Sequence, residues 1–162
     1  MLRNILFDSS EIIVYTNYED YLGLVPSHSD GGGITVYRLS TEVYFKFKSI
    51  DFVFTIPIGF LTNLATIPKP LSGIFSHDDI RIIIPSIVHD YLYSMRAWGQ
   101  RKKSDLIFKR MLSHNKVSSF FTFSIYWILR IFGKTYKDVD DNLVIRMRKL
   151  AFLEDPNVNY FI

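Results

Sequence analysis

The chain has 162 residues, enough for one domain of ordinary size whose hydrophobic core needs no disulfide or structural metal. Hydrophobic residues make up 48% of it and aromatic residues 16%, which excludes an intrinsically disordered protein. There is no cysteine, so a disulfide framework, a thiolate nucleophile and a cysteine-based zinc site are excluded. The net charge of +3 is only mildly basic and Lys and Arg form no long stripe, so we expect no specific nucleic-acid binding.

Alternating apolar and polar residues predict β-strands in the first third of the chain. The expected strands cover residues 11–16, 34–39, 42–47 and 51–56. In the third of these, Val43, Phe45 and Phe47 alternate with polar residues, the period of two that is typical of a sheet with one solvated face. The second and third strands are expected to form a hairpin around Ser40-Thr41, and an antiparallel meander is the simplest arrangement of all four.

From about residue 76 the pattern changes from strands to helices. The expected helices cover residues 76–95, 104–114, 117–132 and 138–152, followed by a C-terminal arm at 154–162. Pro85 either kinks the first helix or marks its start, and Ser104 is the expected cap of the second. This order predicts an α+β fold: an N-terminal antiparallel β-meander followed by three to four C-terminal α-helices. We expect a single domain, mainly β over about 1–58 and mainly α over about 76–153.

Residues 117–132 leave the third expected helix almost no polar face. Buried core is the first interpretation of this pattern, and a protein interface or a helix on a membrane surface are the alternatives. The stretch is shorter than the roughly 20 apolar residues of a membrane span, and Arg130 interrupts it. No transmembrane segment is therefore expected.

The sequence His89-Asp90-Tyr91-Leu92-Tyr93 is the strongest candidate for a functional site. A histidine can exchange a proton near neutral pH, and a neighbouring carboxylate can hold a cation or orient the ring. His89 and Tyr93 are four residues apart and share a helix face. If the next helix packs antiparallel, Asp105 can return beside His89 and fix its tautomer. The alternative for Asp105 is a favourable position in the first turn of its helix.

Three motifs in this order resemble domain of unknown function 1353, a family of tailed phages and prophages. They are Phe-x-Thr-Asn-Leu-Ala-Thr-Ile-Pro at 60–68, the His-Asp-Tyr-Leu-Tyr motif at 89–93, and Ser104-Asp105-x-x-Phe108, which an aromatic helix ending at Phe132-Gly133 follows. The family usually has Asp where this chain has Asn63 and Ser where it has Thr66. The resemblance implies a phage context, and the loss of the carboxylate at Asn63 implies weaker activity if that group is a base or metal ligand in relatives.

The same helix motif is also similar to the core of secreted and parvoviral phospholipases. That similarity implies that His89 is the base for an attacking water, that Asp90 binds calcium, and that Asp105 with Tyr93 orients the imidazole. Calcium, a divalent metal, is the candidate cofactor that it implies. A glycine-rich calcium loop of the expected kind is absent from the sequence, which offers only Gly59 and Gly73 near the motifs.

Two hypotheses of different class follow. In the first, the protein is a tailed-phage accessory protein, associated with the virion or tail, with a hydrolase-like site that acts on a host-envelope component such as lipid or peptidoglycan. Asn63 and Thr66 would then line the substrate pocket. In the second, it is a purely structural virion or tail component, and the His-Asp-Tyr cluster is a buried hydrogen-bond network.

Both hypotheses predict similar partners and the same location for the protein. The expected partners are other phage virion proteins or further copies of this chain, with the host envelope added under the first hypothesis. The first residues already carry Asp8 and Glu11 and lack the apolar core of a signal peptide. We therefore expect the protein in the virion or in the host cytoplasm of an infected bacterium.

Overall fold

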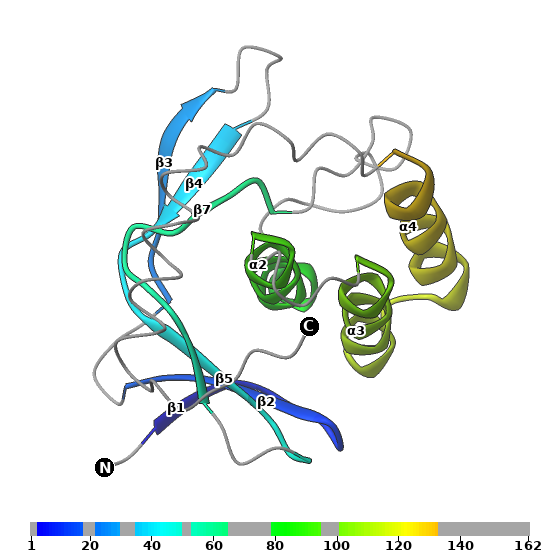
Figure 1. Cartoon of the computed structure of the whole chain (residues 1–162), viewed down its shortest axis with the longest axis horizontal. Coiled ribbons are helices and arrows are strands. Elements are labelled where there is room, and N and C mark those ends of the chain that lie inside the picture. The colour runs from blue at the N-terminus through cyan, green and yellow to red at the C-terminus, as the bar shows by residue number, and fades with distance from the viewer. Residues whose placement is uncertain are drawn as a thin grey trace. The chain divides into compact units, whose positions relative to one another are not determined.

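A computed structural model describes residues 3–17, 22–29, 35–49, 53–64, 79–94 and 101–132 of the chain (Figure 1). The chain forms two compact units, Met1–Ile87 and Val88–Ile162, which are described separately below. The predicted helix at 138–152, the C-terminal arm at 154–162 and Thr66 lie outside the described residues. The expectation of one domain stays a prediction.

The N-terminal unit contains two antiparallel sheets. The first has the order β1 (Arg3–Asp8), β2 (Ile12–Asn17), β5 (Val43–Phe47), β6 (Val53–Ile56), and the second has the order β3 (Leu24–Ser29), β4 (Thr35–Leu39), β7 (Leu61–Thr62). Three helices follow in the sequence: α2 (Ile80–Ser94), α3 (Arg101–His114) and α4 (Ser119–Phe132). The predicted α+β fold is therefore confirmed.

The predicted hairpin around Ser40-Thr41 is wrong. β4 pairs with β3 and β7, whereas β5 pairs with β2 and β6. The reason lies in the backbone at the expected turn. Ser40 N donates to Gly23 O, Leu39 N donates to Phe60 O, and Gly59 N donates to Leu39 O, so these groups already bond to other segments.

Aromatic side chains fill the core of the four-stranded sheet. Val43, Phe45 and Phe47 are buried on one face of β5, as their alternation predicts. Phe54 on β6 stacks on Phe45 with ring centroids 4.8 Å apart, and Phe47 meets both rings edge-on. These rings hold β5 and β6 in the register that pairs Phe45 with Phe54.

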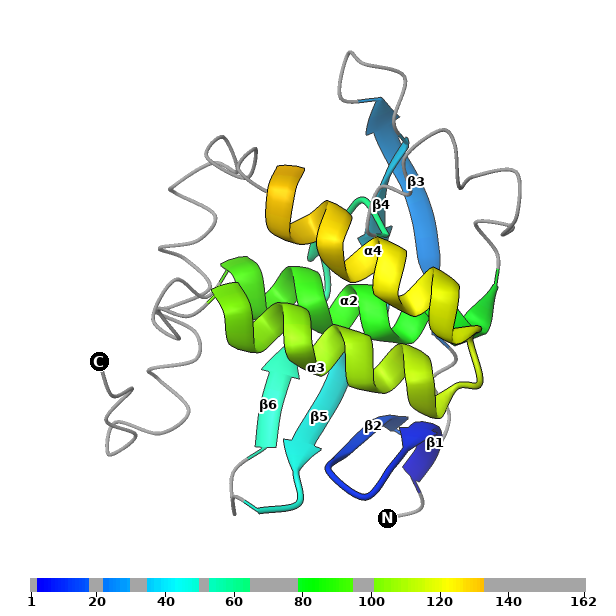
Figure 2. The same ribbon diagram turned by 90° about the vertical axis from the view of Figure 1, so that its right-hand side faces the viewer.

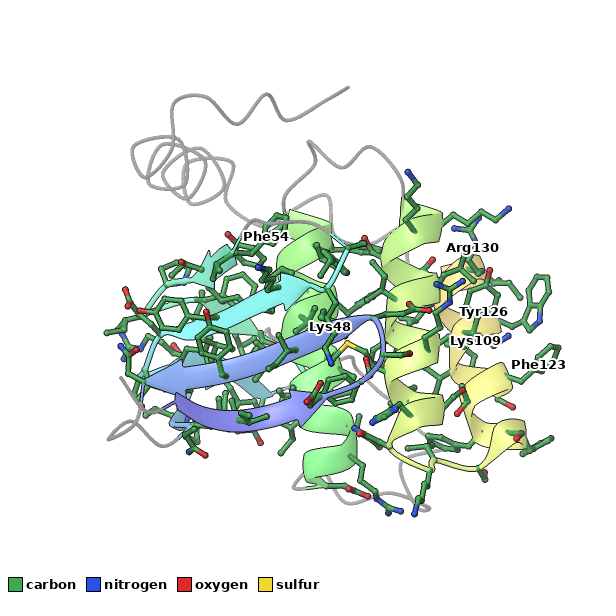
Figure 3. All side chains as sticks on the ribbon, turned by 90° about the horizontal axis from the view of Figure 1, so that it is seen from below. Lys48, Phe54, Lys109, Phe123, Tyr126 and Arg130 are labelled. Atoms are coloured by element: carbon green, nitrogen blue, oxygen red, sulfur yellow. The ribbon has the colours of Figure 1, made fainter. Side chains whose placement is uncertain are left out.

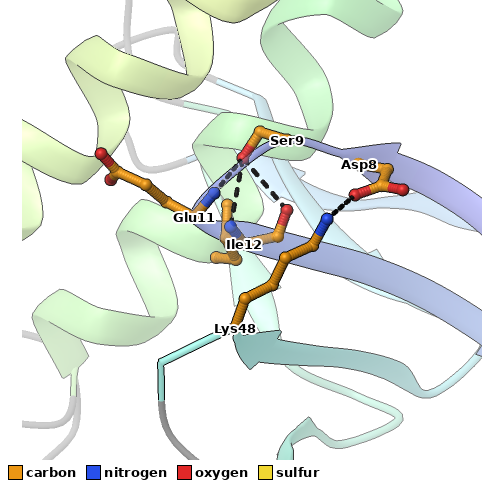
Figure 4. Close-up of polar contacts among 5 residues, drawn as sticks. All are labelled: Asp8, Ser9, Glu11, Ile12 and Lys48. Atoms are coloured by element: carbon orange, nitrogen blue, oxygen red, sulfur yellow. Dashed lines mark hydrogen bonds and ion pairs between the residues drawn. The ribbon is translucent and has the colours of Figure 1, made fainter.

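The turn between β1 and β2 is built by one serine (Figure 4). Ser9 Oγ accepts hydrogen bonds from the backbone N–H groups of Glu11 and Ile12, at 3.2 and 3.1 Å. Beside it, Lys48 Nζ forms an ion pair with Asp8 Oδ1 at 2.6 Å, exposed to solvent. These local bonds explain a hairpin that the alternation of apolar residues did not reveal.

A second strand that the sequence did not reveal is β3, which contains Pro26. It is an edge strand of the three-stranded sheet, and its register with β4 is irregular between Pro26 and His28. Proline lacks the N–H that a central strand needs, so an edge position beside an irregularity is where a sheet tolerates it.

Pro85 does not mark the start of α2, which was one of its two expected roles, and the predicted cap of the second helix is wrong. Asp79 caps α2, because its carboxylate accepts a hydrogen bond from Arg81 N at 3.0 Å, and Pro85 lies inside the helix instead of at its start. α3 already begins at Arg101, so Ser104 is a buried residue of the helix and not its cap. Among the described residues, no helix has both the length and the hydropathy needed to cross a membrane.

Candidate functional site

In the C-terminal unit, Val88–Ile162, a tight turn between α3 and α4 positions the polar side chains of these two helices. Lys116 adopts a left-handed backbone conformation with φ of 58°, and Val117 N donates to Leu112 O while Lys116 N donates to Ser113 O. This is a Schellman motif, and its two hydrophobic members, Leu112 and Val117, are buried. The motif turns the chain so that α4 packs antiparallel to α3 (Figure 2).

His89 on α2 meets Asp105 on α3. Nε2 of the imidazole lies 3.0 Å from Asp105 Oδ1, and the two residues are 3% and 0% exposed. The predicted return of Asp105 to His89 is thus confirmed. The alternative of a first-turn position is wrong, because α3 begins four residues before Asp105 and the carboxylate is fully buried.

Arg130 on α4 binds the other oxygen of the same carboxylate. Its Nη1 donates to Asp105 Oδ2 at 3.2 Å, and its side chain is partly exposed. One buried carboxylate therefore accepts from donors on two different helices. Sequence reasoning treated Arg130 only as an interruption of an apolar stretch, although it is the single charged residue of α4 and such a residue needs a partner.

Two aromatic rings hold the imidazole in place. The centroid of His89 lies 4.5 Å from that of Tyr93 and 5.0 Å from that of Phe108, with tilted ring planes. Tyr93 is one turn further along α2, and Phe108 is one turn beyond Asp105. Phe108 belongs to the third sequence motif, but no role was predicted for it. These contacts fix the plane of the ring and so direct its two nitrogens.

The second ring nitrogen faces Asp90. His89 Nδ1 lies 3.5 Å from Asp90 Oδ1, and both side chains are 4% exposed. This approach is long for a hydrogen bond, and Nδ1 has no hydrogen-bond partner among the described residues. One nitrogen of His89 is therefore held by Asp105, whereas the other lies close to a carboxylate without a hydrogen-bond partner among the described residues.

Opposing effects act on the pKa of His89. Burial alone lowers this pKa, because it penalises the charged imidazolium, but the contacts with Asp105 and Asp90 favour the cation and outweigh burial. The net result is a pKa above the ordinary histidine value of 6.5. The imidazolium then stands between two carboxylates, and it loses its proton only at a higher pH than an ordinary histidine.

The prediction that Asp90 binds calcium stays a prediction. Calcium prefers six or more oxygen ligands, and the described residues contain no group of three or more His, Asp or Glu side chains that could hold a metal. Asp90 Oδ1 is instead directed at His89 Nδ1.

The first sequence motif belongs to the N-terminal unit. Thr62 ends β7 and is buried, and its hydroxyl accepts a hydrogen bond from Leu64 N at 3.0 Å. This bond stabilises the left-handed conformation of Leu64, which has φ of 54°. Asn63 lies between these two residues, half-buried, and its place in a substrate pocket stays a prediction, as does that of Thr66.

A protein-family model matches the chain. The model of the family described as "Protein of unknown function (DUF1353)" matches residues 37–129, more than half of the chain. This span includes Asn63, Thr66, His89, Asp90 and Asp105, and it ends one residue before Arg130. No curated protein and no solved structure matches the chain.

Proposed function

Because this chain belongs to the DUF1353 family, we propose that it is a tailed-phage accessory protein, associated with the virion or tail, that carries a hydrolase site. His89 is the general base of that site, and a host-envelope lipid or peptidoglycan is the substrate. Support for the phage context comes from the family resemblance, and support for the chemistry comes from the geometry around His89.

One observation carries the enzymatic part of the proposal: the two nitrogens of His89 have different surroundings. Nε2 is held by Asp105 at 3.0 Å, and Nδ1 is buried with no hydrogen-bond partner among the described residues. A network whose only purpose is stability leaves few buried polar atoms unsatisfied. A general base, by contrast, needs one nitrogen that is oriented by an acidic residue and one that is free for the proton.

The proposed reaction is hydrolysis with a water molecule at Nδ1. In the neutral imidazole Nε2–H donates to Asp105, so the lone pair of Nδ1 accepts a proton from the water as its oxygen attacks the carbonyl carbon of an ester or amide. Asp105 stabilises the imidazolium that forms, and Arg130 holds Asp105 in position. The imidazolium then returns the proton to the leaving group when the bond to it breaks.

Asn63 and Thr66 complete the proposal as residues of the substrate pocket. An amide in place of a carboxylate can still donate and accept hydrogen bonds, but it can neither act as a base nor carry a negative charge. In this chain His89 is therefore the base, and the N-terminal motif contributes substrate contacts. The variant Asn63→Asp is expected to alter substrate preference without changing the dependence of turnover on His89.

The test is turnover by the purified protein on phospholipid vesicles and on peptidoglycan, with and without added calcium. His89→Gln should abolish turnover, and the wild-type rate should increase with pH as His89 loses its proton. His114→Gln, the same substitution at an exposed residue at the end of α3, is the matched control that should retain activity. Absence of turnover on both substrates under every condition would count against the enzyme.

A structural role is the second candidate, and one observation favours it. His89, Asp90 and Asp105 are all at most 3% exposed, and the Asp105 carboxylate joins α2, α3 and α4. In that case His89→Gln should reduce the free energy of unfolding by about 1 to 3 kcal/mol and have no other effect. Absence of the protein from mass spectra of purified virions would rule out the virion component in either form.

A further inference from the structure

α4 presents large apolar side chains to solvent along one side. Phe120, Phe123, Trp127 and Ile131 are 77%, 54%, 48% and 59% exposed. They are three, four and four residues apart and therefore lie on one helix face, called the α4 face below. The opposite side, with Phe121 and Ile125, is buried. The first interpretation of this helix, buried core, therefore holds for one of its two apolar sides only.

Positive charge is concentrated on the same hairpin. Residues 101–132 contain seven Lys and Arg but a single acidic residue, Asp105, which gives this segment a formal charge of +6. The whole chain has a formal charge of +3, so all other residues together carry −3. Because Asp105 is fully buried, the charged groups that this hairpin exposes to solvent are the cations of Lys and Arg, and no carboxylate.

Lys109 places one of these cations beside the aromatic rings of α4. Its Nζ lies 5.0 Å from the ring centroid of Tyr126 and 5.8 Å from that of Phe123. Figure 3 shows Lys109 beside Tyr126, and Phe123 directed away from the helices. A lysine in this position covers an apolar surface with its methylene groups while its ammonium stays in water, the arrangement found where helices meet lipid headgroups.

We propose that the α4 face binds the surface of an anionic lipid bilayer, with α4 in the plane of the headgroups. Phe, Trp and Ile would enter the boundary between headgroups and acyl chains, and the cations would meet the anionic headgroups. The 14 residues of α4 are too few to cross the bilayer, which fits a peripheral position.

The positive charge of the hairpin favours an anionic membrane as the binding partner of the α4 face over a second copy of the chain. A second copy of the chain would bring another hairpin with a formal charge of +6 close to the first and be repelled, unlike an anionic membrane. A nucleic acid would attract the cations, but the four exposed residues of the α4 face offer its phosphates one donor, the indole N–H of Trp127, and are otherwise hydrocarbon. Membrane binding requires no turnover, so this inference stands or fails independently of the role of His89.

The experiment uses the full-length chain and Trp127 as reporter. The chain has two tryptophans, so Trp98→Phe leaves Trp127 as the only indole. Its fluorescence is followed with vesicles of phosphatidylcholine alone and with vesicles of equal parts phosphatidylcholine and phosphatidylglycerol. We expect a blue shift with the anionic vesicles, which added salt weakens, and little with the neutral ones.

Two matched variants separate the α4 face from exposed apolar residues in general. Ile131 and Ile58 are similarly exposed, at 59% and 62%, but Ile58 lies in a turn of the N-terminal unit. Ile131→Asp should weaken binding by about tenfold or more, whereas Ile58→Asp should leave it unchanged. Circular dichroism shows whether each variant is folded, and Trp127→Ala, read by vesicle sedimentation, repeats the test without a new charge.

Three results would overturn the inference. The first is no binding to anionic vesicles, and the second is equal loss of binding in the two Asp variants. The third is that the wild-type chain does not bind vesicles but self-associates or binds an oligonucleotide, and that Ile131→Asp abolishes this association. That third result would assign the α4 face to a second copy or to a nucleic acid instead.

Discussion

Arg130 Nη1 donates to Asp105 Oδ2 over 3.2 Å, although the two residues are 25 positions apart and lie on different helices. The same carboxylate accepts from His89 through its other oxygen. Asp105 is therefore the residue on which the site's geometry depends, because it joins the catalytic candidate on α2 to the cation on α4. Its replacement should affect both stability and the protonation of His89.

Asp105→Asn should destabilise the protein by about 3 kcal/mol or more. The amide has the shape of the carboxylate but no charge, so the His89 cation and Arg130 would lose their shared partner in a buried site. Chemical denaturation measures the change in the free energy of unfolding. The control is Asp8→Asn, which removes the exposed ion pair with Lys48 and should cost less than about 1 kcal/mol. Equal effects of the two variants would contradict the proposed importance of Asp105.

The raised pKa of His89 predicts how stability depends on pH. The folded state binds the proton more tightly than the unfolded state, so the stabilisation is fully present below the ordinary histidine pKa of 6.5. It is lost as pH rises through the higher pKa of the folded protein. Denaturation at a series of pH values should show the free energy of unfolding decreasing over this window in the wild type. The same decrease in His89→Gln would show that another group is responsible.

Arg130→Met should raise the pKa of His89 further. Without the Arg130 guanidinium, the Asp105 carboxylate interacts with one cation instead of two. The protonated form of His89, the imidazolium, is then favoured more strongly. Titration of the His89 ring by nuclear magnetic resonance measures this pKa, and Arg130→Lys, which keeps the charge, should shift it less. Loss of stability alone would not distinguish this role from packing, but a fall in the pKa of His89 would contradict it.

Lys116→Gly should stabilise the protein by about 1 kcal/mol. Lys116 has φ of 58°, a conformation that costs a residue with a Cβ atom but not glycine. Thermal and chemical denaturation measure the gain, and Lys116→Ala is the control that removes the charge while keeping the Cβ atom. A gain of the same size in Lys116→Ala would assign the effect to charge instead of backbone strain.

The sequence predicted the parts of the fold that depend on local periodicity. The α+β class and the alternation of Val43, Phe45 and Phe47 follow directly from spacing and are confirmed. The pairing of β4 with β3 and β7 could not be predicted, because it depends on pairing with distant segments, such as Leu24 with Leu39 and Leu61 with Arg38, that no local pattern shows. The start of α3 was placed too late because residues 95–103 contain no Ser, Thr, Asp or Asn, and the first capping signal is therefore Ser104.

For the candidate site, spacing predicted the contact between His89 and Asp105, because a short connection between two helices brings them side by side. Arg130 was missed, since its partner lies 25 residues away and only the packed hairpin joins them. An exposed face on α4 was expected only as the alternative to buried core. A helix that is apolar on all sides predicts burial, and the sequence does not show which side stays uncovered.

The central claim is that Asp105 holds Nε2–H of His89 and leaves the lone pair of Nδ1 as the base. The most direct measurement is the tautomer of His89 in nitrogen-15-labelled protein, read from long-range proton–nitrogen spectra above the pKa of His89. The chain has four histidines, and His89→Gln identifies the signals of this ring. The geometry predicts a neutral ring with its proton on Nε2. A proton on Nδ1 would place the lone pair on the side of Asp105 and contradict the proposed base.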